Sequence, residues 1–143
     1  MIISLEDIDI LARTIYGEAR GEFSSTGMAA LIAVANVVLN RSKKKSFWGG
    51  TIRDICLQPK QFSCWNLKDP NRTAMKNAMR GEILFDLCWE TAKNVLEEKW
   101  PDITKGADHY HSIEIAPSWA LRKKPLLTLG RHIFYNLYKE TAL

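Results

Sequence analysis

The feature that most restricts the fold of this chain is an almost wholly apolar stretch, residues 28–40. It reads Met-Ala-Ala-Leu-Ile-Ala-Val-Ala-Asn-Val-Val-Leu-Asn, so a helix formed here would have no polar face for solvent. At about 13 residues, it is shorter than the roughly 20 that a bilayer-spanning helix needs. The stretch therefore predicts a central, buried helix against which the other elements of a globular domain pack.

Other segments have the spacing of helices that bury only one face. Ser4 is a candidate N-cap, and apolar residues recur at helical spacing from Leu5 to Ile15. Glycines at positions 17 and 21 are expected to end that helix, and residues 24–27 are expected to form a turn before the central one. Proline-bounded residues 58–70 are predicted to be irregular. Further helices are predicted over 51–55, 71–80 and 84–99.

The pattern changes after Gly106. Residues 107–111 predict a strand, and residues 126–135 predict a partner that returns across the 117–125 loop. A last helical turn is expected within 136–143. Since 143 residues is the usual size of one domain, we predict a single domain over 1–143. Its fold class is α+β, mostly helical, with a small β-hairpin.

The N-terminus, the cysteines and the net charge bear on the location of the chain, the state of its thiols and its partners. No basic region precedes an apolar core and a cleavage site, so we expect cytoplasmic synthesis without a signal peptide, no stable membrane insertion, and a monomer. Three cysteines favour buried thiols, although a bridge between Cys56 and Cys64 stays open. The net charge of +4 suits an anionic polymer, but a solvated basic surface explains it equally well. No nucleic-acid partner is therefore expected.

Residues 16–22, Tyr-Gly-Glu-Ala-Arg-Gly-Glu, carry the strongest chemical signal. Glu18 and Glu22 are four residues apart at the end of an apolar helix, and the flanking glycines allow one carboxyl group to face a cleft. The negative end of a helix and the removal of water both favour the protonated form of a carboxyl group. Such a glutamate can serve as a general acid. The alternative is two exposed charges neutralised by Arg13 or Arg20.

His109 and His111 give a rival signal. Residues two apart on a strand point the same way, so both imidazoles could bind one metal ion, with His132 as a third ligand. That arrangement would indicate a zinc-dependent enzyme such as an amidase. Two histidines without a clear third ligand do not define a zinc site. We therefore favour histidines that hydrogen-bond in a cleft wall or the core, with no metal and no other cofactor.

Five blocks of sequence, taken together and in order, resemble one family. They are residues 11–41, which include the Tyr16–Glu22 stretch, and then 58–65, 106–111, 117–120 and 129–135. This arrangement resembles the spore-cortex-lytic cell-wall hydrolases, the SleB/CwlJ family. The resemblance implies a lysozyme-like or lytic-transglycosylase-like fold and cleavage of peptidoglycan.

The same resemblance implies roles for individual residues. Glu18 would be the catalytic acid/base, and Glu22 would be supportive, with Arg20 or Arg41 as its expected partner. Tyr110 is expected to orient the glutamate or the sugar. Trp119 and the tryptophans outside these blocks are assigned no function. Because sugars stack on aromatic faces and are fixed by a few polar groups, the expected substrate-binding residues are Gln61, Ser63, Trp65 and His111; a core position is the alternative for Trp65.

We therefore predict an enzyme that cleaves peptidoglycan glycan strands at the MurNAc–GlcNAc β-1,4 bond, most simply as a lytic transglycosylase. Ring closure by the muramic C6 hydroxyl gives a 1,6-anhydro product and needs a single carboxyl group. A hydrolytic muramidase using Glu18 would need a second carboxylate about 5–9 Å away, with Asp54, Asp69 and Asp108 as candidates. The zinc amidase and a non-enzymatic basic module that binds wall or DNA also stay open. We expect action on the wall after membrane permeabilisation, as for a phage-type endolysin.

Overall fold

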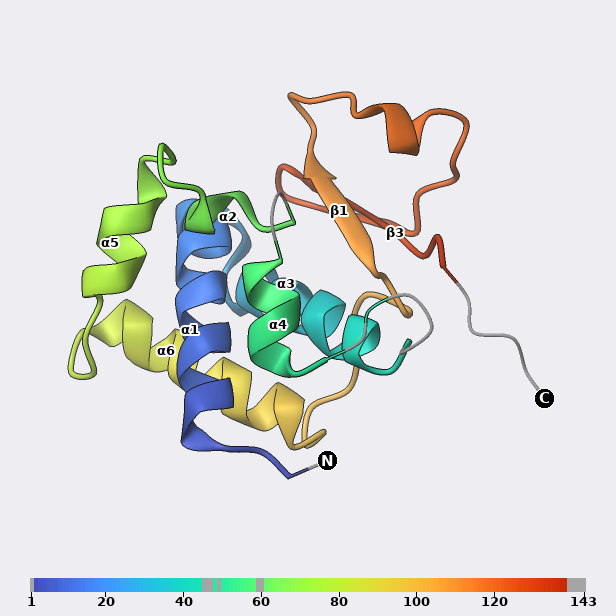
Figure 1. The fold of residues 1–143 in the computed structure, drawn as a ribbon. Helices are drawn as coiled ribbons and strands as arrows, with labels where there is room; N and C mark the ends of the chain where they lie inside the picture. Colours follow the sequence, from blue (N-terminus) through green and yellow to red (C-terminus); the bar gives the residue numbers. More distant parts are fainter. Residues whose placement is uncertain (1, 45–47, 49, 59–60, 139–143) are drawn as a thin grey trace.

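The computed structural model describes residues 2–44, 48, 50–58 and 61–138, with the helices on one side and a small sheet on the other (Figure 1). Helix α3 (Met28–Ser42) packs against both α1 (Leu5–Ala19) and α6 (Ile83–Leu96). Every side chain from Ala30 to Leu39 is buried except that of Ile32. The predicted central helix is therefore confirmed, and it extends two residues beyond Asn40.

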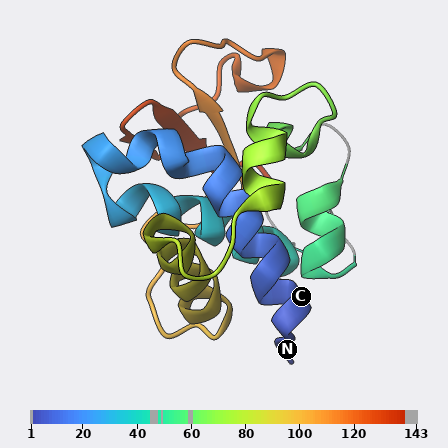
Figure 2. The ribbon, with the colours of Figure 1, turned by 90° about the vertical axis from the view of Figure 1, so that its left-hand side faces the viewer.

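Helix α1 begins where the sequence predicts. The Ser4 hydroxyl accepts a hydrogen bond from the Asp7 N–H at 3.0 Å, and the Asp7 carboxylate accepts one from the Ser4 N–H at 3.1 Å. This capping box satisfies two backbone donors of the first turn. Figure 2 shows α1 running between α6 and α4 (Ile52–Leu57), and α1 also contacts α5 (Asn71–Asn77). The C-terminal end of α1 therefore lies inside the domain.

Several helix boundaries differ from the predictions. Residues predicted as a turn form the short helix α2 (Phe23–Thr26), which a 3-10 turn, η1 (Arg20–Glu22), joins to α1. Helix α5 ends at Asn77 rather than 80, and α6 ends at Leu96 rather than 99. The early end of α6 has a local cause. Glu98 takes the left-handed conformation, with φ 56°, and its N–H donates to the Val95 carbonyl at 2.9 Å.

The sheet has three short antiparallel strands in the order β1-β3-β2, which are β1 (His109–Ser112), β2 (Leu127–Leu129) and β3 (His132–Tyr135). The predicted 126–135 segment is thus a β2–β3 hairpin that turns at Gly130, and β1 adds to it. Tyr110 lies opposite Phe134, and Ser112 lies opposite His132. Side chains alternate along strands, so Tyr110 and His132 share one face while His109 and His111 share the other.

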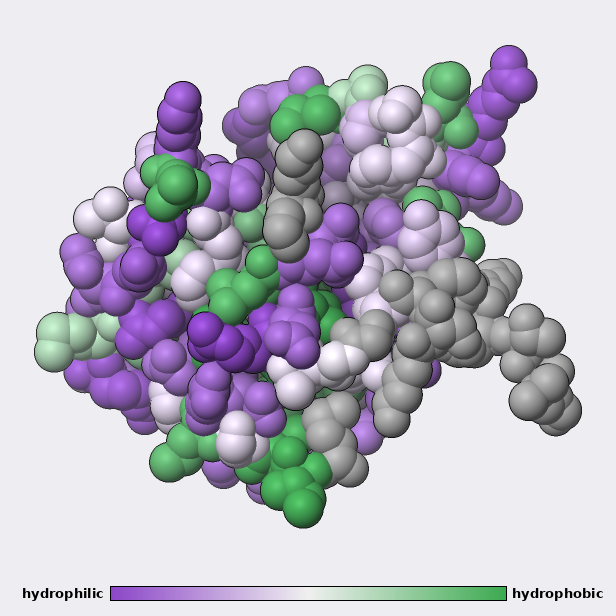
Figure 3. Space-filling view, in the orientation of Figure 1, coloured by the Kyte–Doolittle hydropathy of each residue, from purple (hydrophilic) through white to green (hydrophobic). Residues whose placement is uncertain are grey.

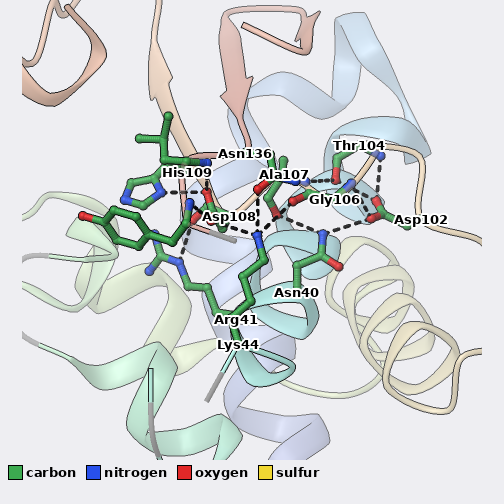
Figure 4. A network of polar contacts seen from close by, with 12 residues as sticks. Asn40, Arg41, Lys44, Asp102, Thr104, Gly106, Ala107, Asp108, His109 and Asn136 are labelled. Atoms are coloured by element: carbon green, nitrogen blue, oxygen red, sulfur yellow. Dashed lines mark hydrogen bonds and ion pairs between the residues drawn. The ribbon is translucent and has the colours of Figure 1, made fainter. Parts of the chain in front are cut away.

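A buried polar network fixes the start of β1 to the end of α3 (Figure 4). The fully buried Asp108 carboxylate accepts hydrogen bonds from Lys44 Nζ and His109 Nδ1, both at 2.9 Å, and from the N–H groups of Leu137 and Tyr138. Burial opposes ionisation, but these hydrogen bonds hold the pKa of Asp108 well below its ordinary value. The network therefore contains a charged carboxylate whose partners satisfy it.

A second part of the network holds the 102–107 loop against α3. Asn40 Nδ2 donates to the Asp102 carboxylate and to the Ala107 carbonyl, both at 2.9 Å. The Asp102 carboxylate also accepts from the Thr104 N–H and hydroxyl, both at 2.7 Å. These bonds position the backbone that leads into β1 (Figure 4). The helical turn predicted for 136–143 is absent over residues 136–138, and the remainder lies outside the described residues.

The three cysteines are free and buried, so no bridge joins Cys56 to Cys64, and the expectation of buried thiols is confirmed. Burial raises the pKa of Cys56 and of Cys88 to about 12, which keeps both thiols protonated. None of the helices in the described part of the chain combines the length and apolarity that crossing a membrane requires.

Candidate active site

Glu18 lies in the last turn of α1, and donors from two other elements converge on its half-buried carboxyl group. Oε2 accepts from the Cys64 N–H at 2.9 Å and from the Ser63 hydroxyl at 3.4 Å, both in the turn η2 (Ser63–Trp65). Oε1 accepts a short hydrogen bond from the Tyr110 hydroxyl on β1. The structure therefore brings together residues that lie more than 40 positions apart in the sequence.

Gly17 explains how η2 can approach the helix so closely. A Cβ at this position would lie 2.5 Å from the Cys64 Cβ and 2.8 Å from its Sγ, which are distances that real side chains do not reach. Helix α1 ends at Ala19, which agrees with the predicted end between Gly17 and Gly21, but Gly17 itself does not break the helix. Its missing side chain instead lets the turn pack on α1, which brings the Cys64 N–H to Glu18.

The Glu18 carboxyl group opens onto a cavity of about 320 Å³, called here the Glu18 cavity. Loops and strands from both sides of the molecule contribute to it, and Glu18 is the only acidic residue in the described lining. The lining consists of Gly17, Glu18, Gln61, Ser63, Asn71, Tyr110, His111, Ser112, Ile115, Pro117, Trp119 and His132.

Three of the four predicted substrate-binding residues line this cavity. Gln61 is exposed, and its Oε1 accepts from Arg41 Nη1 at 3.1 Å. His111 is fixed at both ring nitrogens, because Nδ1 donates to the Ser112 carbonyl at 2.7 Å and Nε2 lies 2.9 Å from the Tyr135 hydroxyl. Ser63, which also contacts Glu18, completes the set.

Trp65 is the residue that the structure places differently. It is not part of the cavity lining, and its indole N–H donates to the Thr14 hydroxyl at 2.9 Å. Thr14 is fully buried in α1, and Trp65 packs against the hydrophobic core. The indole therefore anchors η2 to α1 and is not part of the described lining.

Glu22 has a different partner from the two that were expected. Its Oε1 accepts from the Arg131 N–H at 2.6 Å, so it ties η1 to the β2–β3 turn. A Cβ on Gly130 would lie 2.8 Å from that oxygen, and Gly130 has φ 55°, so this turn needs a glycine. Arg20 instead donates to Asn71 at 3.0 Å, and Arg41 to the Asp108 carbonyl at 2.8 Å. The predicted pairing of Glu22 with either arginine is wrong.

The three histidines do not converge as the zinc hypothesis requires. His109 and His111 both contact the Trp119 ring, with centroids 5.0 and 5.5 Å apart, whereas His132 lies against Tyr110 on the opposite face of the sheet. His109 Nδ1 is bound to the Asp108 carboxylate, and both nitrogens of His111 are occupied. Across the described ranges, no group of three or more His, Cys, Asp or Glu side chains is arranged to hold a metal ion.

None of the candidate second carboxylates lines the Glu18 cavity. Asp54 accepts from the Thr51 N–H at 3.2 Å and caps α4. Asp69 accepts from the Asn71 N–H at 2.8 Å, and Asp108 belongs to the buried network. Each of these carboxylates therefore has a structural hydrogen-bonding role away from the cavity.

Neighbouring ionisable groups remain neutral around the glutamate. Burial, the Glu18 charge and the hydrogen bond to Glu18 raise the pKa of Tyr110 well above its ordinary value, so its hydroxyl keeps its proton. Burial and the same charge raise the pKa of the Cys64 thiol. Burial also lowers the pKa of His132, which favours the neutral imidazole. The lining therefore supplies dipoles rather than charges.

The sequence analysis missed Asn71, Trp119 and His132 as parts of this cavity. Trp119 and His132 belong to two of the blocks that carry the family resemblance, so that signal was available. Asn71 had no such signal, because its place depends on the packing of α5 beside α1 and on the contact with Arg20.

The sequence pattern of the cell wall hydrolase family matches residues 25–135. Spore cortex-lytic enzymes of Bacillus cereus and Oceanobacillus iheyensis are 29% and 28% identical to the chain, over 141 and 139 residues. Each alignment covers 92% of this chain but only 44% and 42% of the relative. The chain thus spans less than half the length of these curated relatives.

Two solved structures share the fold. The catalytic domain of the Bacillus cereus SleB protein superposes with a TM-score of 0.69 at 24% identity, covering 94% of this chain and 92% of that one. The catalytic domain of the germination-specific lytic transglycosylase SleB from Bacillus anthracis gives 0.71 at 24% identity, with 93% and 96% covered. The predicted lysozyme-like fold is confirmed. With five blocks, a matched segment from 25 to 135 and this fold in agreement, the chain belongs to the cell wall hydrolase family.

Proposed function

We propose that this protein cleaves the glycan strands of peptidoglycan at the MurNAc–GlcNAc β-1,4 bond, as a lytic transglycosylase with Glu18 as its acid and base. The observation that carries the proposal is the single carboxyl group in the described lining of the Glu18 cavity. Family membership supports a cell-wall substrate, and the B. anthracis protein of the same fold is a lytic transglycosylase by name.

The chemistry needs one group that gives a proton and then takes one. Protonated Glu18 donates to the glycosidic oxygen as its bond to the muramic C1 breaks, which releases the GlcNAc hydroxyl. The muramic C6 hydroxyl then attacks C1 and loses its proton to the Glu18 carboxylate, which restores the acid. No water enters the products, so no second carboxylate is needed to activate one. General acid–base catalysis of this kind contributes about 10²–10⁴ in rate.

The donors around Glu18 suit both halves of this cycle. The Cys64 N–H, the Ser63 hydroxyl and the Tyr110 hydroxyl hold the two oxygens in place when the carboxylate is charged. None of the three donors is a cation, so protonation of Glu18 leaves no unpaired charge among them. The carboxylate can therefore be oriented and still accept a proton from the sugar.

The remaining lining offers the contacts that a sugar chain requires. The Trp119 ring presents an aromatic face for a pyranose, and Gln61, Asn71 and His132 present polar groups. Arg41 fixes Gln61, and Tyr135 fixes His111, so these groups are held before substrate arrives.

Product analysis tests the proposal directly. Purified peptidoglycan is digested with the wild-type protein, and the fragments are separated and weighed by mass spectrometry. A transglycosylase gives muramic ends lighter by one water than a hydrolase gives, and these ends resist borohydride reduction. Products with reducible ends would instead identify a muramidase. The Glu18→Gln protein is the control, and release of the same products by it would contradict the role of Glu18.

A further inference from the structure

A second cavity, of about 440 Å³, adjoins the Glu18 cavity and is called here the loop cavity. The segment between β1 and β2, which includes the 3-10 turn η3 (Ser118–Ala120), forms most of it. Three residues line both cavities, namely His111, Ile115 and Pro117. The two spaces are therefore neighbours that share one wall, and His111 in that wall is held by hydrogen bonds at both ring nitrogens.

The loop cavity is lined mainly by alkyl side chains that remain open to solvent. Ile113 is 53% exposed, Ile115 is 60% exposed and Leu121 is 72% exposed. Ala116, Pro117 and Ala120 complete the apolar part of the lining. Large apolar side chains scattered singly over a surface are ordinary, but three around one cavity beside a candidate active site indicate a binding surface.

The same cavity has a cation at its edge. Arg122 lines it, and the exposed Lys123 and Lys124 follow. Among the residues that the structure describes, none of these three side chains has a carboxylate partner, whereas Arg131 of the β2–β3 turn pairs with Glu114. Figure 3 shows hydrophobic and strongly hydrophilic side chains side by side over this loop at the upper right of the molecule. The surface thus combines alkyl groups with unpaired positive charge.

We propose that the loop cavity binds the peptide stem attached to the muramic acid that the Glu18 cavity holds. The inference rests on the proposed function, because it assumes a peptidoglycan strand at Glu18. The stem leaves the sugar through a lactyl ether and carries small alkyl side chains and free carboxylates. Alkyl groups gain by burial against the isoleucines and Leu121, and carboxylates gain by pairing with Arg122. The shared wall places the two sites within reach of one substrate unit.

Two substitutions remove the two kinds of contact separately. Leu121→Ser removes an exposed alkyl group from the lining. Arg122→Gly removes the guanidinium group, and because Arg122 has φ 65°, a glycine keeps the backbone conformation without strain. Each has a matched control outside the described lining of both cavities. Leu5→Ser changes a leucine that is 75% exposed, and Lys105→Gly changes an exposed cation with φ 61°.

Binding is measured on the Glu18→Gln protein, so that turnover does not consume the ligand. The probes are a disaccharide–tetrapeptide purified from peptidoglycan and the same disaccharide after an amidase has removed its peptide. We expect the peptide-bearing fragment to bind about tenfold more tightly, and Leu121→Ser and Arg122→Gly each to reduce that ratio to about threefold or less. Both controls should keep the tenfold ratio.

Equal affinities for the two fragments, or variants that weaken both fragments alike, would overturn the stem site. This outcome differs from failure of the proposed function, because the binding ratio does not depend on cleavage. Anhydro products from wild-type digests with no preference for the peptide would leave the function in place and remove the stem site. A clear preference for the peptide-bearing fragment without any glycan cleavage would keep the stem site and contradict the proposed function.

Discussion

The carboxylates of Asp108 and Glu18 are linked through Tyr110 on β1, and the groups that surround the two carboxylates differ. Asp108 immediately precedes β1, and Tyr110, two residues later, donates to Glu18. Around Asp108 the partners are Lys44, His109 and two backbone N–H groups, and no solvent reaches the side chain. Around Glu18 the partners are two hydroxyls and one backbone N–H, and a cavity is open beside it.

The comparison shows that burial alone does not mark a reactive carboxyl group. Hydrogen bonds from His109, from the Leu137 and Tyr138 N–H groups and from Lys44 keep the pKa of Asp108 low, and the network joins α3, β1 and the segment after β3. The donors that orient Glu18 are all neutral, and its carboxyl group opens onto the Glu18 cavity. The two carboxylates therefore differ in their hydrogen-bond partners and in their access to a cavity, and this difference supports the proposed roles of Asp108 in structure and of Glu18 in catalysis.

The largest expected effect is on turnover at Glu18. Glu18→Gln keeps the size of the side chain and most of its hydrogen bonds but cannot exchange a proton. Release of soluble muropeptides should fall by about 10²–10⁴, while the melting temperature stays within a few degrees of the wild type. Turbidity loss of purified walls and thermal unfolding followed by circular dichroism measure the two quantities. Full activity in this variant would show that Glu18 is not the group that exchanges the proton.

The matched change at the other carboxylate should affect stability instead. Asp108→Asn leaves Lys44 without its charged partner and presents an NH₂ group to donors that need acceptors. Breaking a buried ion pair from one side costs about 3–5 kcal/mol of unfolding free energy. Urea unfolding measures this loss, and activity per folded molecule should change less than tenfold. A variant as stable as the wild type would show that the network is not what holds β1.

Acidification should act on the same network. The pKa of Asp108 in the folded protein lies below its ordinary value, which is close to that of the unfolded chain, about 3.9. The stabilisation from ionised Asp108 is therefore complete above about pH 4 and is lost as the pH falls through the folded-state pKa. Urea unfolding from pH 6 down to pH 2 should show the wild type losing more stability than Asp108→Asn. Parallel curves for the two proteins would contradict the assignment.

Tyr110 connects the two regions through β1, and its hydroxyl tests the orientation of Glu18. Tyr110→Phe removes one hydrogen bond to the carboxylate, a loss that corresponds to roughly a tenfold fall in kcat. Tyr16→Phe is the control, because Tyr16 packs edge-on against Phe85 and does not line the Glu18 cavity. An equal fall in both variants would point to a general loss of packing rather than to orientation of Glu18.

Sequence patterns predicted the features that depend on residues close together in the sequence. The central helix follows from the apolar run at 28–40, and the Ser4 cap follows from residues within one turn. Glu18 was singled out by its local stretch and by the resemblance. Apart from the resemblance, which draws on blocks along the whole chain, each of these signals lies within a few residues of the feature it predicts.

The parts that were missed depend on contacts between distant segments. The helix end between Gly17 and Gly21 was predicted, but the close packing of Cys64 on Gly17 was not, because Cys64 comes far later in the chain. Glu22 finds its partner 109 residues away, at the Arg131 N–H, and two nearer arginines are engaged elsewhere. Trp65 resembled a groove residue because its bond to the buried Thr14 is invisible in sequence. Residue type indicated what these side chains could do, but only the packing decided what they face.

Substitution of Arg41 has the smallest expected effect. The test is selective because Arg41 contacts both Asp108 and Gln61, which lines the Glu18 cavity. Its Nε donates to the Asp108 carbonyl at 2.8 Å, and its Nη1 donates to Gln61 at 3.1 Å. The guanidinium group reaches these two acceptors with two separate nitrogens, and a lysine ammonium group lacks that planar fork, so Arg41→Lys should keep the bond at Asp108 and release Gln61. We expect KM for solubilised glycan strands to rise about threefold with kcat changed less than twofold. Arg53→Lys, in an exposed pair with Glu6, is the control. A fall in kcat without a change in KM would mean that Arg41 acts on Glu18 through β1, and the two regions would then be one catalytic unit.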